Sequence, residues 1–253
     1  MPDYKPGTPS WVDLGTPDVD ASAKFYSALF GWTAEKAEDP AAGGYTIFKL
    51  GEDQVAGASP LMMPEQPPAW MTYVSVEDAD ATTSIAASSG GQVIMPGMDV
   101  LDVGRMAVIA DPTGAVICLW QPRAHKGADL VNAPGALTWN ELSTRDTTAA
   151  AAFYSKVFAW EADSKGSDEN PYTEWKLDGK TIGGMMPMGA QIPAEVPSYW
   201  LVYFAVADTD AVVAKTEELG GTVQVPATDI PQGRFAVLAD PHGATFAVIK
   251  MAF

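Results

Sequence analysis

The sequence predicts an α+β protein made of four β-α-β-β-β modules, which form two tandem domains. The chain repeats itself, because Trp11 returns as Trp139, 128 residues later. Each half repeats again, since the helix start at Asp18 returns at Asp78, sixty residues later. A self-match at a fixed period identifies duplicated structural units. The third observation is the order of the predicted elements, which is the same in all four units.

Each module begins with a strand and continues with a helix. The four helix starts carry an Asp, whose side chain accepts a hydrogen bond from an unpaired amide of the first turn. Apolar residues then recur with helical spacing, as Ala21, Phe25 and Leu29 do. The predicted first strands are residues 10–14, 70–76, 137–142 and 199–206, and the predicted helix starts are Asp18, Asp78, Asp146 and Asp208.

Further strands follow each helix, and tight turns separate them. The segments Asp111-Pro112-Thr113-Gly114 and Asp240-Pro241-His242-Gly243 are typical of hairpin turns, because proline presets φ and glycine closes the turn. The pattern of β-branched and aromatic residues predicts later strands at 45–50, 106–109, 115–120, 235–238 and 245–249.

Domain boundaries follow from the repeat and from one irregular segment. Residues 122–134 lack apolar periodicity and contain Pro, Lys, Arg and Asn, which is typical of a linker. We therefore expect a first domain at 1–121 and a second at 135–253. Because two similar domains are joined covalently, we also expect an internal pseudo-dimer and a chain that is a monomer in solution.

Composition excludes several classes of partner. The chain has 32 acidic and 15 basic residues, a net charge of -17, which repels phosphate backbones and anionic membranes. Cys118 is the only cysteine, so no intrachain disulfide can form. The N-terminal residues lack the apolar stretch of a secretory signal, and no apolar run is long enough to span a membrane. We therefore expect a cytoplasmic protein that binds neither nucleic acid nor membrane.

The paired modules, the Phe25-Tyr26 pair on the first helix and the Asp-Pro-x-Gly turns together resemble the vicinal oxygen chelate superfamily. That superfamily includes glyoxalase I, bleomycin-resistance proteins and extradiol dioxygenases. The resemblance covers essentially the whole chain and is nearest to tandem-domain actinobacterial members described as hydroxylase-like or glyoxalase-like. It implies that the mixed sheet of each domain curls around a cleft with a divalent metal at its floor.

The same resemblance implies where metal ligands would stand, and the histidine and carboxylate ligands of the superfamily are missing there. Trp, Met, Leu, Gly and Ala cannot ligate a divalent ion. The two histidines, His125 in the linker and His242 in a turn, lie in separate segments and are expected to be solvated. We therefore expect no metal and no other cofactor. The implied ligand positions are Trp11, Met71 and Cys118 with the neighbourhood of 57–59 in the first half, and Trp139, Leu201 and Ala247 with 183–184 in the second.

The residues that would share these clefts are those of a small-molecule site, with apolar walls and a few oriented polar groups. Strand alternation groups Pro9 and Asp13 with Trp11, and Leu137 and Glu141 with Trp139. Methionines beside the Pro-rich loops would adapt to the edges of a ligand. The candidate ligand-binding residues are Trp11, Asp13, Met71, Tyr73, Cys118 and Trp120, then Trp139, Glu141, Leu201 and Tyr203, and finally Met62, Met63, Met185 and Met186.

Each candidate also has a structural interpretation. Trp11 and Trp139 would plug the clefts, the tyrosines would be ordinary core residues, and Cys118 would be an inert buried thiol. Asp13 and Glu141 need partners if they are buried, either Arg105 and Arg234 or a hydroxyl or ammonium group of a ligand. Glu174 and Asp178 are additional carboxylates near the second cleft, so the two sites need not be equivalent.

Two classes of function remain open. The first is a metal-free binding protein for a flat aromatic or polycyclic compound, such as an aminoglycosylated polyketide, acting in sequestration, resistance or assistance to a tailoring oxygenase. That choice of ligand and partner rests on the resemblance. The alternative is a glyoxalase-like lyase or a hydroxylase or dioxygenase of the same superfamily. A purely structural pseudo-dimer is the third interpretation. The residues favour the binding protein over an enzyme.

Overall fold

The computed structural model describes residues 2, 4–63, 65–167, 171–189 and 192–252. The first half forms one mixed sheet of eight strands in the order β2-β3-β4-β1-β5-β8-β7-β6. Its strands are β1 (Pro9–Thr16), β2 (Thr33–Lys36), β3 (Thr46–Leu50), β4 (Asp53–Pro60), β5 (Ala69–Ser75), β6 (Gln92–Val100), β7 (Gly104–Ala110) and β8 (Val116–Pro122).

The second half repeats the same sheet in the order β10-β11-β12-β9-β13-β16-β15-β14. The α+β prediction of four modules in two tandem domains is thereby confirmed. The strands of this sheet are β9 (Leu137–Thr144), β10 (Glu161–Gly166), β11 (Pro171–Leu177), β12 (Lys180–Pro187), β13 (Tyr199–Ala205), β14 (Thr222–Ile230), β15 (Gly233–Ala239) and β16 (Thr245–Met251).

One helix follows the first strand of each module, and the predicted Asp caps each of them. In the first, the Asp18 carboxylate accepts a hydrogen bond of 2.9 Å from the Ala21 amide, and the other three caps repeat this contact. A short 3-10 turn spans Pro40–Ala42. In the part of the chain that the structure describes, no helix is long and apolar enough to cross a membrane. The helices are α1 (Val19–Phe30), α2 (Ala79–Ser88), α3 (Thr147–Phe158) and α4 (Thr209–Glu218).

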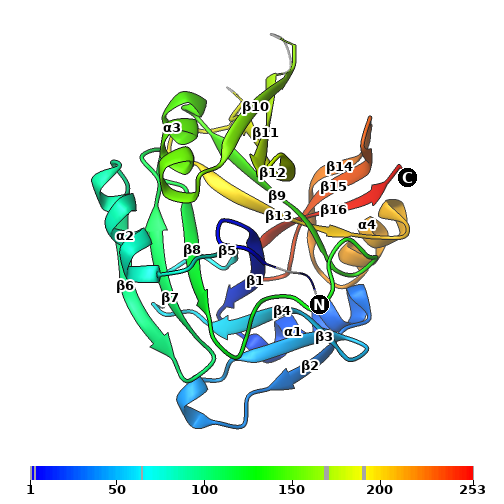
Figure 1. Ribbon diagram of the computed structural model, residues 1–253. Coiled ribbons are helices and arrows are strands. Elements are labelled where there is room, and N and C mark those ends of the chain that lie inside the picture. The colour runs from blue at the N-terminus through cyan, green and yellow to red at the C-terminus, as the bar shows by residue number, and fades with distance from the viewer. Residues whose placement is uncertain (1, 3, 64, 168–170, 190–191, 253) are drawn as a thin grey trace.

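The two sheets pack against each other through the faces that carry the helices. The module containing α1 shares one core with the module containing α4, and the α2 module shares another with the α3 module. Accordingly α2 and α3 lie side by side, as do α1 and α4 (Figure 1). Each sheet therefore keeps a far face, defined as the face that points away from the other sheet.

Two equivalent tryptophans, one in each domain, form hydrogen bonds to the other domain. The Trp32 indole donates to the Gly135 carbonyl at 2.7 Å, and the Trp160 indole donates to the Gly7 carbonyl at 2.7 Å. Gly7 and Gly135 occupy equivalent places, each shortly before the first strand of its domain. Each domain therefore holds the entry segment of the other, which is the pattern of an approximate two-fold relation.

The two motifs that identify the fold also meet at this interface. Tyr26 of α1 donates to the Asp240 carboxylate at 3.1 Å, and the other oxygen of Asp240 accepts from the amides of its own turn, His242 and Ala244. The Trp70 indole donates to the Tyr26 hydroxyl at 2.9 Å. The helix tyrosine and the Asp-Pro turn thus join opposite domains, so both motifs are structural.

The far faces differ in one respect from simple strand alternation. A register shift between Pro9 and Trp11, and a matching one beside Tyr203, interrupt the pairing of β1 and β9 with their neighbours. Leu137 consequently lies in the core between the sheets rather than beside Trp139. Pro9 likewise pairs with Val74, a core residue. Placing Pro9 and Leu137 on the far face was therefore wrong. Beyond a β-bulge, strand residues point to the opposite face of the sheet from the one that simple alternation predicts.

Candidate ligand-binding sites on the far faces

The far face of the first sheet centres on one buried carboxylate. Asp13 of β1 accepts a hydrogen bond of 2.9 Å from the Tyr73 hydroxyl. The Tyr45 hydroxyl interacts with the same carboxylate and accepts a 2.9 Å hydrogen bond from the Trp11 indole. Burial raises the pKa of Asp13 to about 7, although both tyrosines oppose the shift. We call this arrangement, with Cys118 and Trp120, the first site.

The second sheet carries the same arrangement, which we call the second site. Tyr172 and Tyr203 each donate a hydrogen bond of 2.8 Å to Glu141, one to each carboxylate oxygen. The Trp139 indole donates to the Tyr172 hydroxyl at 3.1 Å. Burial raises the pKa of Glu141 above its ordinary value, and the two tyrosines oppose this shift. Leu201, Ala247 and Ile249 form the apolar floor.

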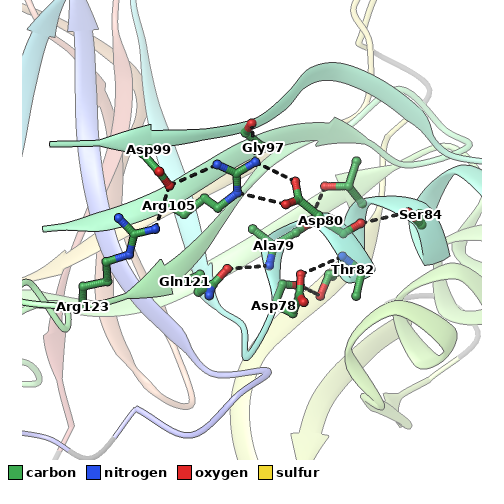
Figure 2. A network of polar contacts seen from close by, with 12 residues as sticks. Asp78, Ala79, Asp80, Thr82, Ser84, Gly97, Asp99, Arg105, Gln121 and Arg123 are labelled. Carbon is green, nitrogen blue, oxygen red and sulfur yellow. Dashed lines mark hydrogen bonds and ion pairs between the residues drawn. The ribbon is translucent and has the colours of Figure 1, made fainter. Parts of the chain in front are cut away.

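Neither arginine considered as a partner reaches these carboxylates. Arg105 forms a bidentate pair with Asp80 at 3.0 and 3.1 Å and also contacts Asp99, so it ties α2 to the β6–β7 hairpin (Figure 2). Arg234 repeats this contact with Asp210 and Asp229. The arginine hypothesis is therefore wrong, because both guanidinium groups are held on the helix-bearing side.

The tyrosines Tyr45 and Tyr172 are site residues that sequence reasoning missed. A signal was available, since Tyr45-Thr46 returns as Tyr172-Thr173 in the same place in the repeat. Two glycines make room for them. A Cβ atom on Gly57 would lie 2.0 Å from the Tyr45 hydroxyl oxygen, and one on Gly184 would lie 1.9 Å from that of Tyr172. Gly57 pairs with Asp13 and Gly184 with Glu141, so each tyrosine occupies the space beside its carboxylate.

The first site is covered by the segment 123–131, within the linker. Its His125 ring stands edge-on to Trp11, with centroids 4.5 Å apart and planes at 82°. The segment is anchored at both ends, because the His125 amide donates to Val103 and the Ala128 amide to Ser10. The expectation of a solvated His125 was wrong: burial lowers its pKa, and its buried Nε2 atom has no hydrogen-bond partner among the residues that the structure describes. Trp11 is 4% exposed and Asp13 is 7% exposed.

The second site is accessible. Trp139, Glu141 and Tyr172 are each partly exposed, as are Tyr199 and Phe235 around them. Among the described residues, no aromatic ring stands on Trp139 as His125 stands on Trp11. The two sites therefore share their polar network and differ in their cover.

The remaining candidates are scattered. Tyr73, Cys118 and Trp120 lie in the closed first site with Met71 at its margin, and burial raises the pKa of the Cys118 thiol. Met62 and Met63 are exposed on the loop after β4. Met186 is 40% exposed at the end of β12.

Two expected neighbours of the second site are elsewhere. Met185 is buried in the core between the sheets, because it alternates with Gly184 and faces the other way, so its assignment to a ligand site was wrong. Asp178 lies in the β11–β12 turn near Lys5, away from the site. Glu174 does belong here, because it pairs with Gly184 across β11 and β12.

The residues at both sites do not fit a divalent metal. Among the described residues, no three His, Cys, Asp or Glu side chains are grouped closely enough to hold one. Each site offers a single central carboxylate, already bonded to tyrosine, and a tyrosine hydroxyl fills the space where the neighbouring strand would present a ligand. Divalent ions need several converging donors of suitable type.

The fold and the tandem modules agree with comparisons to known proteins. Residues 8–119 match the family described as the glyoxalase/bleomycin resistance protein/dioxygenase superfamily, and residues 139–249 match a glyoxalase-like domain. The chain belongs to this superfamily.

Individual relatives carry more specific names. A protein of Mycobacterium tuberculosis named "Putative glyoxylase CFP32" is 45% identical over 99% of this chain and 97% of its own length. The anthracycline biosynthesis protein DnrV of Streptomyces peucetius is 41% identical over 99% of this chain and 96% of its own.

Solved structures share the fold at low sequence identity. The 2,3-dioxygenase LapB of Pseudomonas sp. KL28 superposes with a TM-score of 0.67 and 13% identity, over 99% of this chain and 94% of its own. A Mn(II)-bound glyoxalase of Novosphingobium aromaticivorans gives 0.67 and 14%, over 97% and 82%. These likenesses concern the fold alone.

Proposed function

We propose that this protein binds a small planar aromatic ligand, without a metal, in the second site. The observation that carries the proposal is the contrast at the paired tryptophans. In the first site the chain itself places an aromatic ring, His125, against Trp11. In the second site the equivalent Trp139 is partly exposed, and no described ring covers it. Because the sites are copies, the ring in the first indicates what the second accommodates.

The lining of the second site supports an aromatic occupant. Leu201, Ala247 and Ile249 provide an apolar floor, while Phe235 and Tyr199 stand at its side. Flat rings gain both apolar burial and edge-to-face or stacked contacts from such walls, and two or three polar groups fix their orientation. The first site is then a closed counterpart that contributes stability rather than binding.

The biological role we infer is sequestration of the ligand, resistance to it, or assistance to an enzyme that modifies it. The relationship to a protein named for anthracycline biosynthesis supports an aromatic polyketide as the ligand and a tailoring oxygenase as the partner. We further propose that the chain acts as a monomer, because each domain already packs against its copy. A metal-dependent lyase or dioxygenase has less support, since the described residues of neither site include a metal-binding set of donors.

The test is calorimetric titration with a planar polyketide-type probe, 1,8-dihydroxyanthraquinone, with elemental analysis of the protein as purified. We expect saturable binding that persists after metal chelation, is lost in Trp139→Ala and is kept in Trp11→Phe. Circular dichroism checks that both variants fold. Absence of binding together with near-stoichiometric zinc, nickel or iron would refute the proposal and favour the enzyme.

A further inference from the structure

We propose that the second site selects aromatic ligands that carry a hydrogen-bond donor, above all a protonated amine, and excludes those whose polar group is a carboxylate. This inference rests on the proposed function and specifies its ligand class. The hydrogen-bond directions around Glu141 carry it.

The hydroxyl protons of the two tyrosines that contact Glu141 are already committed. Tyr172 and Tyr203 both donate to Glu141, at 2.8 Å each. The Tyr172 oxygen in addition accepts from the Trp139 indole at 3.1 Å, so the indole proton is committed as well. An indole nitrogen has a single proton, and a phenol has a single proton. None of these four side chains therefore has a donor left for a ligand.

What remains unfilled is an acceptor. An ionised carboxylate offers about four lone-pair positions, of which the tyrosines use two. The Tyr203 oxygen, whose own proton goes to Glu141, keeps its lone pairs. A ligand that brings an N–H or O–H group completes this network, whereas a ligand carboxylate would face acceptors and a like charge.

The surrounding charges favour a cation. Glu174 lies on the neighbouring strand β11, opposite Gly184, and its charge helps raise the pKa of Tyr172. The basic residues beside it, Lys165 and Lys176, are both paired with Asp163. Lys176 also interacts with the charge of Glu174, whereas no basic residue is among the described groups that act on Glu141. Glu141 is therefore the carboxylate with which a ligand ammonium would pair.

A matched probe series tests the inference, because the ring stays constant while the polar group changes. The probes are 2-naphthylmethylamine, 2-naphthylmethanol and 2-naphthoate, measured by titration calorimetry at fixed ionic strength. We expect the amine to bind at least about tenfold more tightly than 2-naphthoate, with the alcohol between them, because hydrogen bonds to charged groups exceed neutral ones.

Two variants separate Glu141 from the overall negative charge. Glu141→Gln removes the acceptor charge and introduces a donor amide, so the preference should fall to within about threefold. Glu217→Gln, on the exposed surface of α4, makes the same change in net charge and should keep the full preference.

The outcomes are distinct. Equal affinity for the amine and 2-naphthoate in the wild-type protein overturns the proposed preference for hydrogen-bond donors but leaves aromatic binding intact. If the preference for the amine survives in folded Glu141→Gln protein, it arises from the overall negative charge rather than from Glu141, and the proposal is also overturned. If none of the three naphthalenes binds, both this inference and the proposed function fail.

Discussion

The first and second sites share one polar network and differ in the exposure of its tryptophan and its carboxylate. Each places one carboxylate between two tyrosines and a tryptophan, and each makes room for a tyrosine with a glycine. In the first site the linker covers this network, while in the second Trp139 and Glu141 remain partly exposed. The difference teaches that the chain itself can close one copy of a duplicated network while the other copy stays partly exposed.

The largest expected loss of stability comes from adding a side chain at the glycines that make room for Tyr45 and Tyr172. Gly57→Ala should displace Tyr45, remove one of the two tyrosine hydrogen bonds of Asp13 and leave the buried Trp11 indole unsatisfied, which should cost roughly 3 kcal/mol or more. Gly184→Ala should cost roughly 1 kcal/mol, because Glu141 and Trp139 are partly exposed and can turn to water. Urea unfolding of both variants measures the difference.

Gly15→Ala is the matched control for these substitutions. A Cβ atom there would lie 3.5 Å from Leu61, an ordinary contact, so little loss is expected. Equal destabilisation by Gly57→Ala and Gly184→Ala would show that the two sites are equally closed.

The second expected effect is a pH dependence that belongs to the first site. The folded pKa of Asp13, about 7, exceeds the unfolded value near 3.9, so the folded state binds the extra proton between these values. Stability therefore falls as pH rises from about 4 to about 7 and is constant above. Between pH 5.5 and 8 the loss should be roughly 2 kcal/mol.

Asp13→Asn isolates this contribution from the other acidic groups. The variant should lose the Asp13 part of the slope, so its stability relative to wild type should rise with pH in urea unfolding experiments. Parallel pH profiles for the wild type and Asp13→Asn would mean that Asp13 is not held in its protonated form by burial.

The fold was predictable from the sequence because its signals are local and repeated four times. Asp18 and its three counterparts cap the helices, and Asp111 and Asp240 close hairpins, with no information needed from distant residues. The bulges beside Trp11 and Tyr203 were not predictable, since strand alternation assumes an unbroken register. One shifted residue was enough to misplace Leu137.

The candidate sites were predictable only in part. Trp139, Glu141 and Tyr203 do converge, because they occupy paired positions on adjacent strands. Tyr172 was missed because its strand joins the site from the other side of β9. The cover over the first site was missed as well, because an irregular segment such as 123–131 has no periodicity from which to place His125.

A smaller effect is expected when the His125 ring is removed from the segment that covers the first site. His125→Ala should leave a space the size of an imidazole beside Trp11 and cost roughly 1–2 kcal/mol. Adding millimolar imidazole should restore part of the lost thermal stability, because the ring can return to the space as a free ligand. His242→Ala, in the partly exposed turn after β15, is the control and should not respond. If imidazole fails to stabilise His125→Ala, the ring is not seated as the structure places it.

The most direct test of the account is the binding stoichiometry of 2-naphthylmethylamine, measured by titration calorimetry on the full chain. An open second site and a closed first site predict one molecule bound per chain, abolished by Trp139→Ala and unaffected by Trp11→Phe. Two equivalent molecules per chain, or one that is lost in Trp11→Phe and kept in Trp139→Ala, would contradict the division between the sites.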